Sequence, residues 1–437
     1  MKPAKVVLIG AASASFGPGS IQDAMQCKPL HGGELVLVDL NAGRLEVMAR
    51  LARRIAKESG VRLDVTTAVD RRRALEGADF VITSIAMNRN ALWRLDWEIP
   101  RKYGFRQVLG ENGGPGGLFH TLRNVPVMLA VCRDMEELCP DAWLINYTNP
   151  ESRVCLAINR YTRIKAIGLC HGIFMGMGTV ADIVKIDHRD LDIKAAGLNH
   201  FLWALSIHRR STGEDLYPLL RERAAALPAT YLPLTIALLK TYGLIPFPSD
   251  DHIGEYLGFA FDVCRHTEFD FEKAEADKGK VWDRVVRMAA GDEVIGDFMH
   301  TQPGESAFDI IGAMLADTNV FVPAVNILNQ GCIANLPADA VVEVPAMASA
   351  AGIYGLSVGA LPSPIAALCQ VQVGVQRLAV EAAFTGCRQT ALHALLADPV
   401  VHDLQAAEQC LDEMLAAQAE YLPQFGAAGS AKGAMIE

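Results

Sequence analysis

The sequence predicts an α/β protein with a doubly wound parallel sheet in its first part and an α+β domain in its second. Short apolar runs alternate with helical patterns through roughly the first 190 residues. Beyond that point the alternation gives way to longer helical segments and loops. Alternating strands and helices are typical of a parallel sheet covered on both faces. We therefore expect one domain over 1–190 and a second over 191–437.

Six apolar runs are the predicted strands of the first domain, because strands buried on both faces consist of nearly continuous apolar residues. In chain order they are KVVLIG (5–10), ELVLVDL (34–40), RLDVTTAVD (62–70), FVITSIA (80–86), AWLINYT (142–148) and KAIGLC (165–170). Stretches such as AGRLEVMARLARRIAKES between them have helical periodicity. In the second domain, IKAAGLNHFLWALSIH indicates two strands that meet at a turn, and VVHDLQAAEQCLDEMLAAQAEYL indicates a helix.

The composition favours a globular protein that binds small molecules. Hydrophobic residues make up 51% and charged residues 21%, which is enough to form a sizeable core. A net charge of −10 argues against nucleic acids and anionic membranes as partners. Ten scattered cysteines without a C-x-x-C pair indicate a reducing compartment, so we expect a cytoplasmic protein. The first apolar run, 6–9, is shorter than the roughly 7–15 residues of a signal peptide core.

The loop after the first strand, GAASASFGPGS, raises the question of dinucleotide binding. The usual fingerprint is G-x-G-x-x-G, and only Gly10 stands in register here, with Ser13 following. Asp39 ends the second strand, where an acidic residue binds both ribose hydroxyls of NAD and repels the 2′-phosphate of NADP. The first domain is therefore predicted to be Rossmann-like with NAD as its ligand. An ordinary β–α loop is the alternative.

Two polar motifs follow in the same half of the chain. VLGENGGPGG (108–117) is either part of a binding site or a flexible surface loop. INYTNP (145–150) places Asn146 and Asn149 at the end of a predicted strand, where buried amides are costly unless they form hydrogen bonds. Asn149 is thus a candidate ligand-binding residue, with a role as helix cap as the alternative.

A cysteine and a histidine suggest a metal site. GLCHG (168–172) ends the last predicted strand of the first domain, and GLNH carries a histidine 30 residues after the cysteine (200 − 170 = 30). Cys170 and His200 are suitable ligands for Zn²⁺, Mn²⁺ or Fe²⁺, and two protein ligands leave positions for substrate oxygens. A buried cysteine beside a satisfied histidine is the alternative. A nucleophilic Cys170–His171 pair is disfavoured, because adjacent strand residues point to opposite faces.

SDDHIGEY (249–256) gathers acidic, histidine and tyrosine side chains in one loop-to-helix stretch. The spacing of His252, Glu255 and Tyr256 places them on one helical face. A helix start that is acidic because of the helix dipole is the alternative.

Together and in this order, Asp39, GENGGPGG, NYTNP, GLCHG, GLNH, SDDHIGEY and VNILNQGCIANLPADAVVEVP resemble glycoside hydrolase family 4, over residues 1 to about 370. The resemblance implies a fold similar to lactate and malate dehydrogenases, and a glycosidase that depends on NAD and a divalent metal, usually Mn²⁺. It implies that the sugar 3-hydroxyl is oxidised, that the C2 proton is removed and the aglycone eliminated, and that water addition and re-reduction follow without net use of NAD.

The resemblance also implies roles for single residues. Cys170 and His200 match the metal ligands, and His171 takes the place of a candidate acid for the leaving group. Asp250 is the candidate base, with Tyr256 as the runner-up. The remaining matches are Asn149 for sugar hydroxyls, and Gly10, Ser13 and Asp39 for NAD.

Three departures from the family pattern bear on ligand contacts. The nucleotide loop is GAAS, where many members have more glycines. His120 stands where some members carry an arginine after the GPGG loop, so it is expected to contact the substrate. The CHG form favours an unphosphorylated α-glycoside, namely an α-glucuronide, α-glucoside or α-galactoside. The family also implies a homodimer or homotetramer.

Two other functions remain open at this point. A 2-hydroxy acid dehydrogenase of the lactate/malate type would use the same fold and Asp39, but it gives Cys170 and His200 no metal to bind. A non-catalytic NAD or sugar sensor would bind its ligand without turnover and would tolerate the loss of Asp250.

Overall fold

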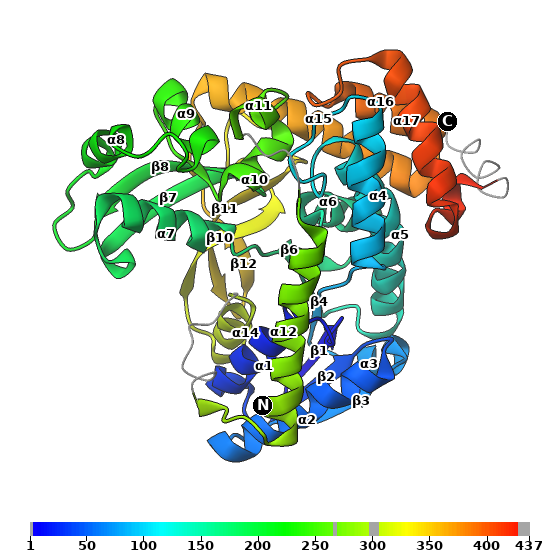
Figure 1. Cartoon of the computed structure of the whole chain (residues 1–437). Coiled ribbons are helices and arrows are strands. Elements are labelled where there is room, and N and C mark those ends of the chain that lie inside the picture. Colours follow the sequence, from blue (N-terminus) through cyan, green and yellow to red (C-terminus); the bar gives the residue numbers. More distant parts are fainter. Residues whose placement is uncertain (1–2, 265–268, 297–305, 427–437) are drawn as a thin grey trace.

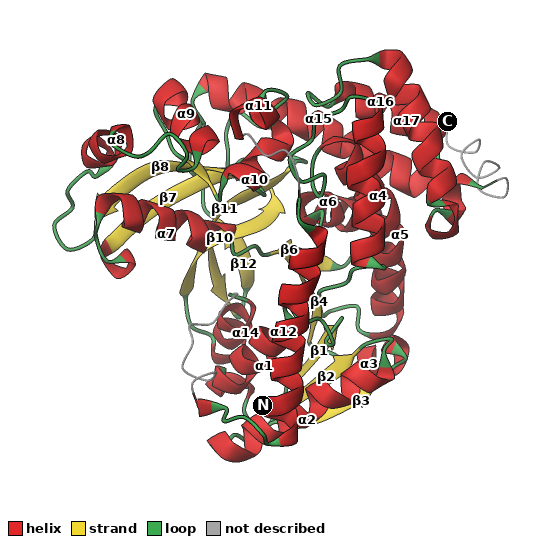
Figure 2. Cartoon of the chain, in the orientation of Figure 1, coloured by secondary structure: helices red, strands yellow, loops and turns green. Residues whose placement is uncertain are grey.

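The computed structural model describes residues 3–264, 269–296 and 306–426, which form an α/β structure around one long mixed sheet (Figures 1 and 2). The sheet has the strand order β3-β2-β1-β4-β5-β6-β10-β11-β7-β8-β9, and β12 pairs with β11 at its side. Strands β1 to β6 are parallel to one another, whereas the strands from β10 onward pair antiparallel. The predicted fold class, a doubly wound parallel sheet with an α+β part after it, is confirmed.

The strands of the described residues are β1 Lys5–Ile9, β2 Glu34–Val38, β3 Asp64–Ala68, β4 Phe80–Thr83, β5 Trp143–Asn146, β6 Lys165–Gly168, β7 Leu191–Leu198, β8 Phe201–Arg209, β9 Pro246–Phe247, β10 Val320–Leu328, β11 Val341–Ser349 and β12 Gly352–Gly355. The first six match the predicted runs, but each ends one to three residues earlier. The polar residues at the ends of those runs therefore lie in loops beyond the carboxyl ends of the strands. The turn predicted between two strands in 193–208 is the Asn199–His200 turn between β7 and β8.

The helices of the first part are α1 Gly17–Gln26, α2 Ala42–Ser59, α3 Arg71–Leu75, α4 Arg89–Lys102, α5 Gly114–Leu138, α6 Glu151–Tyr161 and α7 Gly172–Val184. Those that follow are α8 Tyr217–Ala225, α9 Pro233–Tyr242, α10 Asp250–Ile253, α11 Ala260–Cys264, α12 Phe271–Ala290, α14 Ala307–Ala316, α15 Ser363–Thr385, α16 Arg388–Ala397 and α17 Leu404–Ala417. Short 3-10 turns lie at Lys28–Leu30, His188–Asp190, Gly254–Tyr256, Ala419–Tyr421 and Pro423–Phe425. None of the helices in the described ranges has the length and apolar character needed to cross a bilayer.

The two faces of the sheet are covered by different helices, as the alternation of β1 shows. Val6 and Leu8 pack into a core with residues of α1, α2 and α14. Val7 and Ile9 point the other way and pack with residues of α3 and α5. Successive strand residues face opposite sides of a sheet, so a strand covered on both faces must be apolar at every position. This is the physical reason why KVVLI forms a central strand.

The sheet continues from the first predicted domain into the second. Gly168 at the end of β6 pairs with Asn326 of β10, and Glu343 of β11 pairs with Gly197 of β7. Gly168 has no room for a side chain, because a Cβ there would lie 1.2 Å from Oε1 of Glu151. This junction brings the chain segments after β6 and β7, with Cys170 and His200, toward the same region.

Candidate active site

A cavity of about 2180 Å³ opens beyond the carboxyl ends of the parallel strands. Ligands of open α/β sheets bind at this edge. Eight of the ten residues predicted for the site line this one cavity, namely Gly10, Ser13, Asp39, His120, Asn149, Cys170, His171 and His200. Asp250 and Tyr256 are not among the lining residues.

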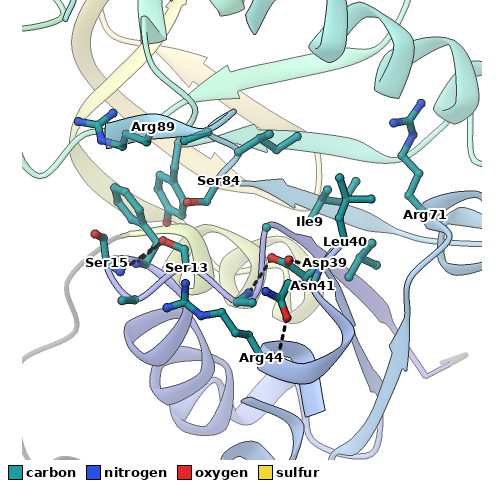
Figure 3. A pocket seen from close by; sticks show the side chains of 18 of the residues that line it. Ile9, Ser13, Ser15, Asp39, Leu40, Asn41, Arg44, Arg71, Ser84 and Arg89 are labelled. Atoms are coloured by element: carbon teal, nitrogen blue, oxygen red, sulfur yellow. Dashed lines mark hydrogen bonds between the residues drawn. The ribbon is translucent and has the colours of Figure 1, made fainter. Parts of the chain in front are cut away.

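At one end of the cavity, the β1–α1 loop meets the end of β2 (Figure 3). Gly10 has a φ of 88°, and a Cβ at this position would lie 2.0 Å from the carbonyl oxygen of Ser84. Asp39 accepts the backbone N–H of Ala12 at 3.0 Å through Oδ2 and that of Asn41 at 2.9 Å through Oδ1. Each carboxylate oxygen retains a second lone pair, so Asp39 can still accept hydroxyl groups from a ligand.

The glycine-rich segment 108–117 is buried, so the alternative of a flexible surface loop is wrong. Oε1 of Glu255 accepts the backbone N–H groups of Glu111 at 2.5 Å, of Asn112 at 2.8 Å and of Gly113 at 3.4 Å. Helix α5 begins directly after these bonds, at Gly114. Glu255, from the SDDHIGEY stretch, therefore fixes the loop that brings Glu111 to the cavity wall.

Asn149 faces the cavity and does not cap the next helix. The N-cap position of α6 is Pro150, and no side chain caps the helix there. The Asn149 amide donates to Oε1 of Glu111 at 3.4 Å, and Arg89 forms an ion pair with the same oxygen at 2.5 Å. Burial raises the pKa of Glu111, but Arg89 and two neighbouring histidines outweigh it and lower the pKa to about 2. This wall of the cavity thus holds a permanent carboxylate that is paired with a guanidinium.

His120 lies against the same wall. Its Nδ1 is 2.9 Å from the carbonyl oxygen of Glu111, so Nδ1 carries the proton and donates it. Burial, reinforced by Arg123, lowers the pKa of His120 to about 3. The imidazole is therefore neutral near pH 7 and offers Nε2 as an acceptor.

His200 is buried at the turn between β7 and β8, and Cys170 lies beyond the end of β6. Nδ1 of His200 contacts Asn112 Nδ2 at 3.1 Å and lies 3.8 Å from Oε2 of Glu255. The φ of His200 is 60°, a backbone conformation that non-glycine residues rarely adopt and that is often found at functional sites. Burial, with His252 close by, lowers the pKa of His200, which favours the neutral form that binds metals.

The donor set at this end of the cavity fits a divalent cation that the protein holds through two side chains. A thiolate and an imidazole suit Zn²⁺, Mn²⁺ or Fe²⁺. Oε2 of Glu255 lies 3.8 Å from Nδ1 of His200 and has no hydrogen-bond partner within the described structure, so a carboxylate stands beside the imidazole that would bind the cation. Within the same ranges, no three His, Cys, Asp or Glu side chains form a set that could hold a metal alone. Further ligands would have to come from substrate or water.

Asp250 is not placed to act as the base, because its carboxylate is used inside the protein. Asp250 is buried, with 4% exposure, and accepts hydrogen bonds from the backbone N–H of Leu234 at 2.8 Å, the N–H of Thr235 at 2.7 Å and the Thr235 hydroxyl at 2.6 Å. These groups lie at the start of α9. The carboxylate thus stabilises the N-terminus of that helix.

Tyr256 lies nearer the proposed metal ligands. Its hydroxyl donates to the carbonyl oxygen of Asn199 at 3.1 Å, directly before His200 in the chain. Burial raises the pKa of the phenol well above its usual value; Glu255 raises it further, and Arg153 lowers it. His252, from the same segment, lines the cavity beside His200 with ring centroids 4.4 Å apart, and its Nδ1 contacts Asp251 at 2.8 Å. The expected common face of His252, Glu255 and Tyr256 is therefore split between α10 and a 3-10 turn.

Sequence reasoning gave no role to several residues that shape the site, among them Arg89, Glu111, Asn112, His252 and Lys278. Glu111, Asn112 and His252 lie inside motifs that the sequence singled out, so position within those motifs was the available signal. Arg89 on α4 and Lys278 on α12 carried no local signal, because only the tertiary fold brings them to the cavity.

Comparison with known proteins identifies the family. The model described as family 4 glycosyl hydrolase matches residues 5–186, and the model of its C-terminal domain matches residues 195–401. An alpha-glucosidase of Erwinia rhapontici is 33% identical, over 96% of this chain and 98% of its own length. An alpha-galactosidase of Bacillus subtilis is 30% identical, over 96% and 99%.

Solved structures show the same fold. The lplD protein of Bacillus subtilis superposes with a TM-score of 0.85 at 26% identity, over 94% of this chain and 99% of that one. A 6-phospho-alpha-glucosidase from gut microorganisms, in complex with NAD and Mn²⁺, gives 0.84 at 23% identity, over 97% and 99%. Malate dehydrogenase of Plasmodium falciparum gives 0.51 at 13% identity, over 87% and 98%, which relates the folds alone.

The fold and cavity define an α/β enzyme of the Rossmann type, with a polar site beyond the carboxyl ends of its strands. The two family models cover most of the chain, and the chain belongs to glycosyl hydrolase family 4. It is a glycosidase of that family.

Proposed function

We propose that this protein hydrolyses an unphosphorylated α-glycoside with NAD and a divalent cation, Mn²⁺ by preference. The observation that carries the proposal is the gathering of eight predicted NAD, metal and sugar residues in one cavity. The relatives named alpha-glucosidase and alpha-galactosidase, and the NAD and Mn²⁺ present in the structure of a similar protein, support it.

The residues at the β1–β2 end of the cavity fit NAD. Gly10 is required in this loop because a Cβ would meet the carbonyl oxygen of Ser84, and Asp39 would bind the adenosine ribose hydroxyls and disfavour NADP. Cys170 and His200 would hold the cation. When bound, NAD supplies reversible oxidation at the sugar C3, and the cation supplies a Lewis acid that stabilises the negative charge formed after loss of the C2 proton.

The protein's own groups then have distinct tasks. Asn149 and neutral His120 would orient sugar hydroxyls, the first as donor and the second as acceptor. Tyr256 remains the candidate for the C2 proton because Asp250 is committed to α9, but its hydroxyl donates to Asn199 and does not line the cavity, so it could act only as a phenolate turned toward the substrate. His171, at the exposed start of α7 beside Cys170, would give a proton to the departing aglycone. Water adds to C1 after elimination, and reduction at C3 completes the hydrolysis.

The substrate and reaction type are tested with p-nitrophenyl α- and β-glycosides, including uronides, assayed with NAD, Mn²⁺ and a reductant. We expect release of p-nitrophenol from an α-glycoside without net growth of absorbance at 340 nm. Growth at 340 nm in proportion to turnover would instead support a dehydrogenase. Ligand binding without turnover of any glycoside would support a sensor. We further propose a cytoplasmic homodimer or homotetramer, on the cysteine pattern and the family resemblance.

The metal site is tested by Cys170→Ser, which removes the soft thiolate ligand. We expect loss of Mn²⁺-dependent activity by at least about 100-fold, with an unchanged circular dichroism spectrum. Cys332→Ser is the matched control, because Cys332 is also half-buried but does not line the cavity. A Cys170→Ser enzyme with the metal-dependent rate of the wild type would refute the assignment.

A further inference from the structure

Most backbone N–H groups of the β1–α1 loop donate to oxygens of the protein itself, so the loop has few of them to offer a phosphate. In nucleotide-binding α/β proteins, a glycine-rich loop and the following helix normally donate backbone N–H groups to the diphosphate. Here Oγ of Ser13 accepts the N–H groups of Ser15 at 3.3 Å and Phe16 at 3.4 Å. The N–H groups of Gly10 and Ala11 donate to the carbonyl oxygen of Val38, and that of Ala12 donates to the Asp39 carboxylate. The N–H of Ser13 donates to the carbonyl oxygen of Gly10, and that of Gly17 donates to the carbonyl oxygen of Ser13. A diphosphate at this loop therefore needs a positive charge from another element.

Arg44 is the cavity-lining arginine that is available for this purpose. The other arginines that line the cavity each have a carboxylate within 4.0 Å: Arg71 and Arg72 at Asp134, Arg73 at Asp70, and Arg89 at Glu111. Within 3–264, 269–296 and 306–426, no carboxylate comes that close to Arg44, and its buried Nε has no hydrogen-bond partner. A half-buried guanidinium without a counter-ion is suited to an anionic ligand.

The position of Arg44 is set by both ends of its side chain. Asn41 caps α2 by accepting the N–H of Arg44 at 3.0 Å, which fixes the first turn directly after Asp39. Figure 3 shows the side chain extending from this turn toward the Ser13 turn. The guanidinium carbon lies 3.9 Å from the ring centroid of Trp282, which also lines the cavity. A guanidinium can stack on an aromatic ring and still bind a phosphate through its edge.

Trp282 comes from α12, a helix of the second predicted domain that packs against α2 (Figure 1) and whose residues Lys278 and Trp282 line the cavity. Near its start, Phe271 packs against Trp93 of α4, with ring centroids 5.3 Å apart. Near its end, Arg54 of α2 donates to the carbonyl oxygen of Met288. Helix α12 is therefore held at both ends, and Trp282 between them keeps Arg44 beside the loop.

We propose that Arg44, held on the ring of Trp282, binds the diphosphate of the dinucleotide in place of the loop amides. The inference rests on the NAD binding proposed above and deepens it. Asp39 and Arg44 lie at the two ends of one short segment, and each then binds a different group in the adenosine diphosphate half of the cofactor. The carboxylate takes the ribose hydroxyls, and the guanidinium takes the phosphates. A helix from the second domain thereby contributes to cofactor affinity.

The test is calorimetric titration of the purified full-length protein with NAD and with ADP-ribose, which carries the diphosphate without nicotinamide. Arg44→Met should lower the affinity for both ligands alike, by about 10- to 100-fold, because a hydrogen bond to a charged group is lost. Trp282→Leu should weaken both by about 3- to 10-fold, and Trp282→Phe should lie closer to the wild type. Arg50→Met is the matched control, since it removes the same charge from an exposed position on α2 outside the cavity.

The outcomes separate this inference from the proposed function. If the wild type binds NAD and Arg44→Met binds NAD and ADP-ribose with unchanged affinity, the inference is wrong and the proposed function stands. If Arg44→Met weakens the binding of NADP but not that of ADP-ribose, Arg44 contacts the 2′-phosphate of NADP and the inference is also wrong. Wild-type binding of ADP-ribose should weaken more with added salt than that of Arg44→Met; equal salt dependence would contradict a phosphate contact. A wild type that binds no NAD would overturn both proposals.

Discussion

At the scale of single residues, His120 shows how burial fixes the charge state of a group in the site. The carbonyl oxygen of Glu111 accepts the proton on Nδ1, and burial with Arg123 nearby lowers the pKa to about 3. A protonated imidazole would lose its acceptor at Nε2. At neutral pH, His120 can therefore recognise a hydroxyl group but cannot pair with an anionic group of the substrate.

The lowered pKa of His120 predicts a pH-dependent stability. The unfolded chain binds a proton near pH 6.5 and the folded chain only near pH 3, so stability present above 6.5 is lost as the pH falls toward 3, by at most about 1.4 kcal/mol per unit. Urea unfolding at pH 7.5 and 5 should show a smaller loss for His120→Gln than for the wild type. His393→Gln, at an exposed position, is the control. The same pH slope in His120→Gln and wild type would show that His120 is not the group responsible.

At the scale of elements, two acidic residues of the SDDHIGEY stretch hold other segments in place. The Glu255 carboxylate accepts hydrogen bonds from the backbone N–H groups before α5, and the Asp250 carboxylate accepts those from the start of α9. Leu232 at the N-cap of α9 has no side-chain oxygen, so the cap comes from a different helix. One short stretch thus holds both the loop that carries Glu111 and the start of α9.

The capping role of Asp250 predicts a loss of stability rather than a loss of chemistry. Asp250→Ala should lower the free energy of unfolding by about 2 to 3 kcal/mol, since a buried carboxylate with three hydrogen bonds is removed. The rate per folded molecule should stay near that of the wild type. Asp403→Ala is the control, because Asp403 is exposed and its side chain caps α17 through a hydrogen bond from the N–H of Ala406, so about 1 kcal/mol is expected. Full stability together with an abolished rate would restore Asp250 as the base.

At the scale of the whole molecule, the two predicted domains share their core. Residues of β1, β2, α1 and α2 form one apolar cluster with Val285 and Met288 of α12, with Ile310 and Ile311 of α14, and with strand residues up to Ile353. The sheet also passes from β6 to β10 without interruption. The first 190 residues alone would leave much of this apolar surface exposed.

We propose from this shared core that residues 1–190 and 191–437 unfold as one unit. Scanning calorimetry of the full chain should give a single transition whose calorimetric and van't Hoff enthalpies agree. Residues 1–190 expressed alone should lack a cooperative transition, because the face of the sheet under α12 and α14 loses its cover. Two separate transitions in the full chain would contradict the shared core.

The first six strands and the β7–β8 pair could be predicted from sequence because the central strands are apolar along most of their length, whereas β9 to β12 lie in the part of the chain for which the sequence indicated helices and loops. The site residues that follow the strands could be predicted, since the carboxyl ends of parallel strands meet at one edge. The directions in which neighbouring side chains point could not be predicted. Asp250 and His252 are two positions apart, yet one faces α9 and the other faces the cavity, and a short helix followed by a 3-10 turn decides which.

Contacts between distant segments lay beyond sequence reasoning for a different reason. Arg44 and Trp282 each look like ordinary residues of amphipathic helices, and only the path of α12 across the cleft brings them together. The same holds for Glu111 and Arg89, which pair across the cavity wall. Local periodicity carries no information about such pairs.

The pairing of Gly168 with Asn326 has a consequence for how members of this family can exchange parts. Gly168 is confined by Glu151, so the ladder cannot shift to accommodate a different neighbour. A chimera that joins the first half of this chain to the second half of a relative must therefore contain a β10 strand that can pair with β6 at Gly168. The proposed metal ligands Cys170 and His200 follow β6 and β7 at the two sides of this junction, so a poorly fitting β10 strand would also disturb the proposed metal site.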